Sequence, residues 1–475
     1  MAETQEQVAE RGFLDRYFEI SKRGSTIGRE VRGGIVTFVT MAYIVVLNPI
    51  ILTTTADVDG NQLDFGQVGA VTALTAGVMT ILFGIVSRLP FAFAAGLGIN
   101  AFVAFTMVGQ VTWPEAMALV LINGALIVLL AATGLRRMIF DAVPMELKIA
   151  ITVGIGLFIA FIGFVNSGFV TSSASPPVGL GVFGSVATIP TVLFIVTLVL
   201  TGILVARKVK GGLLIGLVTG TVLAVISEAI WKLGPGVENP GGWGLTVPTL
   251  EGSPFSLPDL SLVGAVSFDF GKVGAITVVM LVFSLLFMNF FDAMGTFTGL
   301  SREAGLADEK GNFPRLKSAL VVEGLGAVAG GLTSSSSNTV FIESGSGIGE
   351  GARTGFANLI TGGMFLLAMF LTPLAKIVPT EVAAAALVVV GAMMMTQIKG
   401  IDFSRFDVAL PVFLTVTVMP FTYSIANGIG AGFIAWVLIR AFVGKAREIH
   451  WLLWVVAAGF VVFFGRGPFE ALIGA

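Results

Sequence analysis

Residues 334–348 read Ser334-Ser335-Ser336-Ser337-Asn338-Thr339-Val340-Phe341-Ile342-Glu343-Ser344-Gly345-Ser346-Gly347-Ile348 and form a polar stretch in an otherwise apolar chain. The stretch is too short and too interrupted by Gly and hydroxyl residues to cross a bilayer as a simple helix, which needs about 20 apolar residues. Apolar runs flank it on both sides, so we expect it at membrane depth. Irregular polar backbone survives there only where protein buries it or a wet cavity adjoins it. Glu343 in its middle is an ionisable group that marks a functional site.

The composition is that of a multi-pass membrane protein. Of the 475 residues, 55% are hydrophobic and only 12% are charged, whereas soluble domains carry about 25% charged residues. The chain has no Cys, which excludes disulfides, thiolate metal sites and Cys nucleophiles. Its net charge of −2 is too small to indicate nucleic-acid binding. We find no phosphate-binding loop or metal-ligand cluster in the sequence, and therefore expect no cofactor.

Apolar runs predict an all-α membrane protein with fourteen transmembrane segments. The expected segments of the first half are 33–51, 68–86, 91–109, 115–134, 147–166, 189–206 and 211–231. After a Pro- and Gly-rich loop, those of the second half are 272–292, 318–333, 338–350, 355–373, 380–397, 408–424 and 428–444. A last apolar stretch, Trp451 to Gly465, either spans the membrane or lies on it.

The Lys and Arg residues predict the orientation, because cytoplasmic loops carry an excess of them. With the N-terminus inside, most of the 27 Lys and Arg residues fall on the cytoplasmic side of alternating spans. We therefore expect a multi-pass protein of the plasma or inner cell membrane with a cytoplasmic N-terminus. Residues 1–32 form the cytoplasmic N-terminal segment, in which residues 12–20 are either an amphipathic surface helix or a frayed tail.

The two halves resemble each other. Val143-Pro144 and Val378-Pro379 open the fifth and twelfth segments and precede Gly156 and Gly391 by the same interval. Because seven is odd, the second copy enters the membrane upside down, as in secondary transporters built from inverted repeats. We expect the first seven-span repeat in residues 33–231, an extracellular loop in 232–271, the second repeat in 272–447 and a C-terminal apolar segment in 448–475.

Two segments are expected to break at membrane depth. Residues 89–95 cannot start a clean helix and should run extended before a helix begins at Gly96. Asn338 to Ile342 should do the same before Glu343. Short extended pieces from inverted copies would pair antiparallel and satisfy each other's backbone groups. Two half-helix N-termini would then point at the middle of the protein, where their N–H groups can bind a ligand.

Two carboxyl groups carry the expected chemistry. Glu343 lies in the broken tenth segment, and Asp292 ends the eighth. Burial disfavours the charged form of a carboxyl group, so we expect these acids to take up and release a proton near neutral pH. The alternatives are an acid satisfied by backbone N–H groups for Glu343 and a cytoplasmic helix-end residue for Asp292.

Residues around the acids complete the predicted site. Asn100 can offer a donor and an acceptor to an amide-like edge, or it can form a helix–helix hydrogen bond. Phe341, Phe93 and Phe291 can stack on a planar ring or serve as packing. The predicted substrate-binding set is Glu343, Asp292, Asn100, Thr339, Gly98, Phe341, Phe93 and Ser344, and Glu343 and Asp292 are the residues predicted to couple the proton.

Motifs along nearly the whole chain carry a family resemblance. They include Thr37 to Pro49, Gly96 to Phe102, Phe291-Asp292-Ala293-Met294-Gly295-Thr296, Ile342-Glu343-Ser344 and Met419 to Gly428. In this order they resemble the AzgA-like purine (hypoxanthine, guanine and adenine) permeases of the second nucleobase–cation symporter family.

The resemblance implies a core domain of spans 1–4 and 8–11 and a gate domain of spans 5–7 and 12–14, which often mediates dimers. It implies import of purine nucleobases with protons by alternating access between the two domains. It carries the family's binding acids over to Asp292 and Glu343, and its third-span asparagine to Asn100.

Three hypotheses remain open at this point. The first is a proton-coupled purine importer, with the nucleobase, protons and membrane lipid as partners and a homodimer through the gate domain open. The second is an anion exchanger or channel of the same 7+7 fold, or a transporter of another nucleobase such as uracil or xanthine. A permanent carboxylate at Glu343 would repel anions. The third, a membrane-embedded enzyme, has no catalytic constellation to support it.

Overall fold

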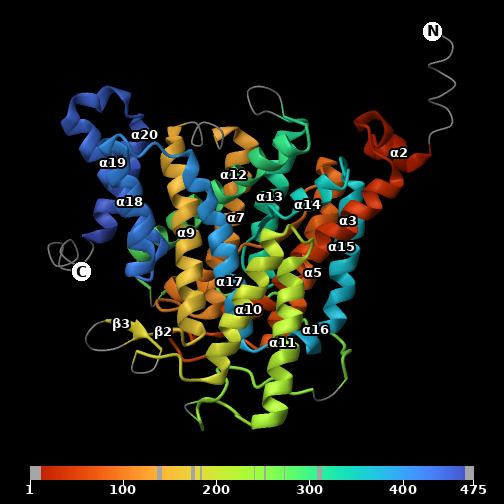
Figure 1. Ribbon diagram of the computed structural model, residues 1–475. Coiled ribbons are helices and arrows are strands. Elements are labelled where there is room, and N and C mark those ends of the chain that lie inside the picture. The colour runs from red at the N-terminus through yellow and green to blue at the C-terminus, as the bar shows by residue number, and fades with distance from the viewer. Residues whose placement is uncertain are drawn as a thin grey trace.

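The computed structural model describes residues 12–135, 142–172, 177–181, 184–239, 241–250, 253–271, 273–307 and 313–465. Its helices stand largely side by side (Figure 1). The elements of the first half are α2 Phe13–Phe18, η1 Ser21–Arg23, α3 Ile27–Met41, α4 Ile44–Thr53, α5 Phe65–Ser87, β1 Phe93–Ala95, α6 Leu97–Phe102, η2 Val103–Met107, α7 Trp113–Thr133, α9 Met145–Asn166, β2 Val170–Ser172, β3 Val178–Leu180, α10 Ile189–Ala206 and α11 Gly212–Trp231. Those of the second half are α12 Ala275–Glu303, α13 Leu316–Leu332, β4 Asn338–Val340, α14 Ser344–Gly349, α15 Phe356–Ala368, η3 Met369–Leu371, α16 Thr372–Ala375, α17 Thr380–Met395, η4 Thr396–Gly400, α18 Phe406–Phe421, α19 Ile425–Arg440, η5 Ala441–Lys445, η6 Ala446–Glu448 and α20 Trp451–Phe464.

The helices have the lengths and composition of a multi-pass membrane protein. In the described part of the chain, 10 helices are long and apolar enough to cross a bilayer, and the shorter apolar helices include Leu97–Met107 and Phe406–Phe421. The count of fourteen segments remains a prediction. Helix α20 has 14 residues, which extend only about 21 Å. It is therefore too short to cross the roughly 30 Å hydrocarbon layer by itself.

The first span begins earlier than the predicted residue 33. Helix α3 begins at Ile27, because the Thr26 side chain accepts a hydrogen bond from the backbone N–H of Arg29 and caps the helix. The charged residue Glu30 is nevertheless buried, since its carboxylate accepts the backbone N–H groups of Arg353 (2.8 Å) and Thr354 (3.3 Å). The hydropathy pattern did not reveal that this charge is satisfied inside the protein.

The predicted end of the eighth segment at Asp292 was wrong. Helix α12 continues to Glu303, so Asp292 lies well inside it rather than at its end. The side chains that follow, including Ala293, Phe297 and Leu300, are buried and keep the helix packed. Asp292 is therefore not a helix-end residue.

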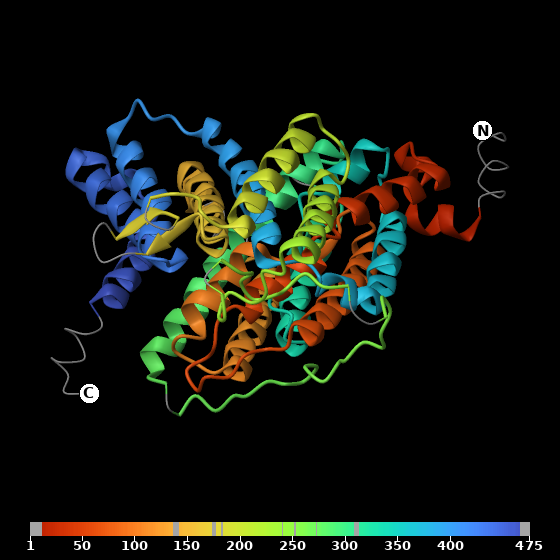
Figure 2. The ribbon, with the colours of Figure 1, turned by 60° about the horizontal axis from the view of Figure 1, so that its bottom comes forward.

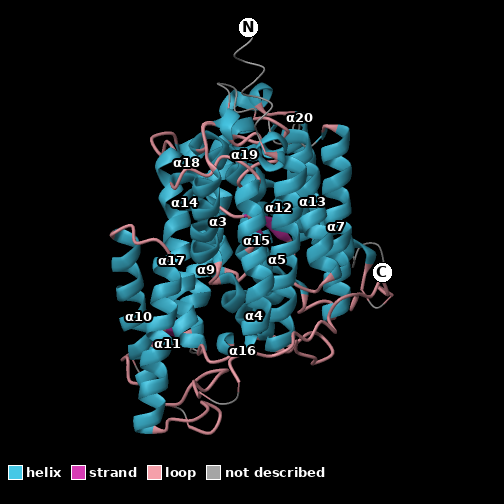
Figure 3. Cartoon of the chain, turned by 90° about the vertical axis from the view of Figure 1, so that its right-hand side faces the viewer, coloured by secondary structure: helices cyan, strands magenta, loops and turns pink. Residues whose placement is uncertain are grey.

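The predicted antiparallel strands are confirmed. Strand β1 pairs with β4, with Phe93 opposite Val340 and Ala95 opposite Asn338. The ladder continues beyond the strands, because the Phe341 N–H donates to Ala92 (2.9 Å) and the Gly96 N–H donates to Ser337 (3.0 Å). Figure 3 shows this magenta pair enclosed by helices. The two broken segments thus satisfy much of each other's backbone.

Side chains from neighbouring helices satisfy further backbone groups of this strand pair. Thr80 of α5 accepts from the Phe93 N–H (2.9 Å) and donates to its carbonyl oxygen (3.1 Å). Asn358 of α15 donates to the carbonyl oxygens of Leu89 (3.1 Å) and Phe91 (2.7 Å). Buried backbone polar groups need such partners where water is excluded.

Helices of the first half pack against helices of the second half. Helix α7 packs on α13, and α9 packs on α17. The α9–α17 contact is close because both helices carry Gly where they meet. A Cβ on Gly156 would lie 2.8 Å from the Gly391 carbonyl oxygen, so neither position has room for a side chain.

The loop between the halves lies across one face of the helices, as Figure 2 shows. Its backbone is tied to the helix ends beneath it. The N–H groups of Ser256, Gly264 and Ser267 donate to carbonyl oxygens of Phe370, Leu332 and Pro114, respectively. A second antiparallel pair, β2–β3, also lies on this side of the molecule and was not predicted.

We predict that Asn358→Leu destabilises the protein. The substitution leaves two buried carbonyl oxygens without their side-chain donor, and each lost partner costs about 1–3 kcal/mol. The measurement is the thermal unfolding midpoint in detergent, with Asn427→Leu as the control. Asn427 makes an exposed hydrogen bond to Thr422 (3.1 Å). Equal midpoints for the two variants would contradict this account of the strand pair.

Candidate functional site

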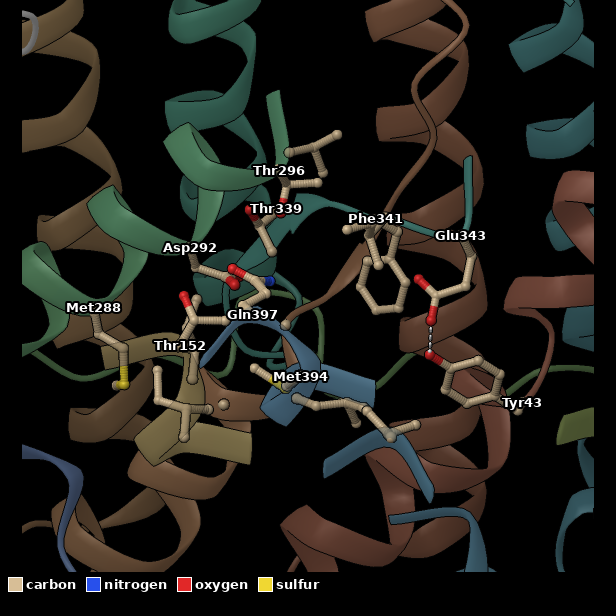
Figure 4. A pocket seen from close by; sticks show the side chains of 18 residues that line it. Tyr43, Thr152, Met288, Asp292, Thr296, Thr339, Phe341, Glu343, Met394 and Gln397 are labelled. Carbon is tan, nitrogen blue, oxygen red and sulfur yellow. Dashed lines mark hydrogen bonds between the residues drawn. The ribbon is translucent and has the colours of Figure 1, made fainter. Parts of the chain in front are cut away.

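A cavity of about 120 Å³ lies beside the strand pair. Figure 4 shows the side chains that line it. They come from both halves of the chain: Tyr43, Gly96, Leu97, Gly98, Ile99, Thr152, Ile155, Met288, Asp292, Thr296, Thr339, Val340, Phe341, Ile342, Glu343, Val390, Met394 and Gln397. The walls are mainly apolar and carry a few polar groups, which is typical of small-molecule sites. Its volume is below the roughly 300–1,000 Å³ of pockets for drug-sized ligands, so it suits one small molecule.

The two predicted acids reach this cavity from different elements. Asp292 extends from α12, with Met288 and Thr296 one turn before and after it on the same helix face. Glu343 lies in the turn between β4 and α14. Neither carboxyl group forms an ion pair with Lys, Arg or His within the described residues. The buried Glu323 of α13 lies close enough to Asp292 to interact with it electrostatically.

Tyr43 holds Glu343 in place. This residue lies at the break between α3 and α4 and is buried. Its hydroxyl donates to Glu343 Oε1 at 2.5 Å. The bond fixes one carboxyl oxygen, and the carboxyl group as a whole still lines the cavity. Tyr43 was not among the predicted site residues.

Five predicted substrate-binding residues line the cavity: Glu343, Asp292, Thr339, Gly98 and Phe341. Gly98 adjoins Ile155 of α9 so closely that a Cβ there would lie 2.7 Å from its Cγ2 atom. Thr339 is buried, and its hydroxyl has no hydrogen-bond partner within the described part of the protein. It is therefore available to a ligand in the cavity.

The other three predicted residues are buried and do not line the cavity. Asn100 donates to the side chain of Asn48 (2.6 Å), which is the helix–helix hydrogen bond considered as its alternative. Phe93 packs against Phe83 with ring centroids 4.7 Å apart. Ser344 accepts from the Ala92 N–H (2.9 Å). In this geometry Asn100 links α6 to α4, whereas Phe93 and Ser344 belong to or bond the region of the strand pair, and their direct contact with substrate remains a prediction. The side chain of Phe291 lies outside the described residues.

Several lining residues were missed by the sequence reasoning. Thr152 comes from α9, Met394 from α17 and Gln397 from η4, the short helix that follows α17. Figure 4 shows Gln397 near Asp292. No local motif marks them, because their position depends on the packing of α9 against α17. A polar residue directly after an apolar span was the sole available signal, and it was weak.

The polar side chains that line the cavity suit hydrogen bonding to a ligand better than metal binding. Within the described ranges, no group of His, Cys, Asp and Glu side chains could hold a metal ion. The cavity instead offers two carboxyl groups, hydroxyls of Thr152, Thr296 and Thr339, and an amide. Such groups can pair with the N–H and carbonyl edges of a planar heterocycle, while the apolar wall contacts its faces.

Comparison with known sequences gives matches over nearly the whole chain. A family model described as "Permease family" matches residues 28–431. The guanine/hypoxanthine permease PbuG of Bacillus subtilis is 36% identical over 95% of this chain and 99% of its own length. The adenine permease AdeP of Escherichia coli is 34% identical, over 96% of this chain and 97% of its own length.

Comparison with solved structures identifies the same architecture at low sequence identity. The transmembrane domain of a cyanobacterium bicarbonate transporter, BicA, aligns with a TM-score of 0.60 over 91% of this chain and 97% of that domain. The identity is 16%, so this likeness concerns the fold alone.

We predict that Tyr43→Phe lowers the thermal unfolding midpoint. The change removes the donor to a buried carboxyl oxygen, which costs about 1–3 kcal/mol. Tyr423→Phe is the matched control, because the structure gives that hydroxyl no hydrogen bond within the described residues and its ring packs on Phe105 and Phe158. In a Glu343→Gln background the effect of Tyr43→Phe should change, since neighbouring groups couple. Strictly additive effects would contradict a Tyr43–Glu343 bond.

Proposed function

The chain belongs to this permease family, and on that premise we propose that it imports purine nucleobases in symport with protons. Membership confirms the resemblance seen in the sequence and makes the chain a permease, not an enzyme. The purine class is supported by the names of the relatives, which include guanine/hypoxanthine and adenine permeases. No cofactor is proposed, and the coupling ion is the proton.

The observation that carries the proposal is the pair of acids at one small cavity. Glu343 and Asp292 hydrogen-bond the edge of the base, and Phe341 and Met394 contact its faces. Thr339 adds a hydroxyl that has no partner in the described structure. One of the acids exchanges the coupling proton with the cytoplasm, because burial makes a carboxyl group easier to neutralise.

The proposed orientation is supported by the basic residues on the face that carries α2. Arg23 donates to the carbonyl oxygens of Arg88 (2.7 Å) and Arg353 (3.3 Å), and Arg315 also reaches the end of α5. Such an excess of Arg is typical of cytoplasmic faces. We therefore place this face in the cytoplasm and the loop of residues 232–271 outside the cell, with the protein in the plasma or inner membrane.

The proposed transport cycle moves a core domain (spans 1–4 and 8–11) against a gate domain (spans 5–7 and 12–14). The cavity lies between elements of both, since α12 and β4 belong to the core and α9 and α17 to the gate. Two residues that line the cavity, Ile342 and Gln397, are also exposed to solvent. Gln397 lies two residues before Lys399, one of the residues of the basic face. A cavity that is exposed near the basic face fits a state of the cycle in which the site is open to the cytoplasm.

The far side of the gate is covered. Trp243 is fully buried and donates from its indole nitrogen to Glu228 (2.8 Å). The next residue, Gly244, donates its N–H to Glu381 at the start of α17 (2.9 Å). This loop therefore closes the proposed extracellular end of the gate helices.

An anion exchanger of the same fold is the second candidate. The structural likeness to a bicarbonate transporter favours it at the level of the fold. The cavity argues against it, because its two carboxyl groups lack a neighbouring cation in the described part of the protein. An anion bound there would meet like charges with nothing to offset them.

We predict that Glu343→Gln reduces purine uptake driven by a pH gradient by at least about tenfold, because hydrogen bonds to charged groups contribute about 1.5–3 kcal/mol. The amide keeps the shape of the side chain but cannot release a proton. The measurement is radiolabelled adenine, guanine and hypoxanthine uptake in vesicles at two external pH values. Glu238→Gln on the exposed loop is the control. Proton-dependent uptake by Glu343→Gln at the unaltered rate would overturn the assignment.

Gln397→Leu should weaken purine binding about two- to tenfold, the value of one neutral hydrogen bond, and should change the preference among purines that differ in their exocyclic group. Binding is measured by ligand-induced thermal stabilisation. Gln67→Leu is the matched control, because that side chain bonds Asp259 on the exposed surface (2.9 Å). Unchanged affinity and selectivity would place Gln397 outside the binding site.

A further inference from the structure

Three arginines from separate parts of the chain meet at the end of α5 that lies on the basic face. We call Arg23, Arg88 and Arg315 the α5-end cluster. Arg23 donates to the Arg88 carbonyl oxygen (2.7 Å), and Arg315 donates to the Val86 carbonyl oxygen (3.1 Å). The Arg88 guanidinium lies over the Tyr17 ring, 4.2 Å from its centroid. Residues that are far apart in the sequence thus form one positively charged site.

The positive charge of the α5-end cluster is only partly balanced. Glu19 pairs with Arg23 (3.2 Å) and with Lys22 (3.1 Å). Arg88 and Arg315 form no salt bridge within the described residues, although the charge of Glu19 also acts on Arg315. Burial and the nearby charge of Arg88 lower the pKa of Arg315, which lies outside the spans. In addition, Arg88 Nε is buried without a hydrogen-bond acceptor in the described structure.

Capping of helix α5 explains a part of this arrangement. Cations are favourable beside the carbonyl groups at a helix C-terminus, and Arg23 and Arg315 each use an N–H group in this way. The Arg88 side chain takes no part in the capping. A guanidinium has five N–H groups, so most of the donors of the cluster are left for another acceptor.

An apolar surface lies next to the α5-end cluster. Helix α2 exposes Phe13 (72%) and Leu14 (37%), while Phe18 on its other side is buried against Phe356, with ring centroids 5.7 Å apart. Figure 1 shows α2 at the same end of the molecule as the upper ends of α3 and α15. A helix with an apolar exposed face beside cations is suited to the headgroup region of a membrane.

We propose that the α5-end cluster binds the phosphate group of an anionic phospholipid, with α2 lying in the headgroup layer beside it. Arginine is well suited to phosphate because its planar fork of N–H groups matches two phosphate oxygens. The lipid is favoured over free phosphate because the exposed Phe13 and Leu14 adjoin the charges. The cytoplasmic leaflet is the source, since anionic lipids are found there. This leaflet assignment rests on the proposed orientation and does not depend on the transported substrate.

The test measures the affinity of the full-length purified chain for short-chain phosphatidylglycerol, by native mass spectrometry in a neutral detergent. Short-chain phosphatidylcholine is the neutral arm, and inorganic phosphate is the arm for a free anion. Each Arg near a membrane surface contributes about 1 kcal/mol, or about fivefold. Arg88→Gln/Arg315→Gln should therefore weaken phosphatidylglycerol binding by about 25-fold and leave phosphatidylcholine binding unchanged.

The matched control is Arg207→Gln/Lys208→Gln, which removes two exposed positive charges from the turn between α10 and α11. It should lose clearly less phosphatidylglycerol affinity than the cluster variant, because the proposed phosphate contacts lie in the α5-end cluster and not in this turn. If the double variant does not fold, Arg315→Gln alone, with its exposed side chain, should lose about fivefold. Equal losses in the cluster and control variants would show a nonspecific charge effect and overturn the proposal. Competition by inorganic phosphate at the same concentration would overturn the lipid assignment.

Discussion

The fold depends on how two broken segments satisfy their backbone polar groups at membrane depth. In hydrocarbon an unpaired N–H or carbonyl group costs several kcal/mol, so an extended chain there needs a partner for each group. Strands β1 and β4 supply most of these partners to each other. Thr80 and Asn358 supply more from the flanking helices. The strand pair in turn sets where α6 and α14 begin, and with them the position of Glu343 at the cavity.

The cavity combines groups that are carried by different kinds of element. Asp292 lies inside a continuous long helix, and Glu343 lies in a turn that the Tyr43 hydroxyl holds. The opposite wall comes from α9 and α17, which pack closely where Gly156 meets Gly391. Groups that could contact a ligand therefore come from two sets of helices on different sides of the cavity. A transporter needs this arrangement if one set is to move against the other while both contact the substrate.

The sequence was sufficient to predict the strand pair and to select two acids that line one cavity. Broken polar segments in an apolar chain have few physical solutions. It was insufficient to separate residues that line the cavity from buried residues behind its wall. Asn100, Phe93 and Ser344 do not line the cavity: Asn100 bonds Asn48, Phe93 packs on Phe83, and Ser344 accepts from the Ala92 N–H, so their contact with substrate remains a prediction. Tyr43 and Gln397 were missed, since only the three-dimensional packing brings them to the cavity. Buried charges such as Glu30 also led to a predicted start of the first span that is later than the observed one, because the sequence does not show that hydrogen bonds satisfy them.

The central claim is that purine movement and proton movement are coupled at one site. The most direct measurement places the unmodified chain in vesicles that contain a pH-sensitive dye, with no initial pH gradient, and then adds a substrate outside. Our account predicts that adenine, guanine or hypoxanthine acidifies the vesicle interior, whereas bicarbonate or chloride does not. Purine entry without acidification, or an anion-driven flux without any response to purines, would contradict it.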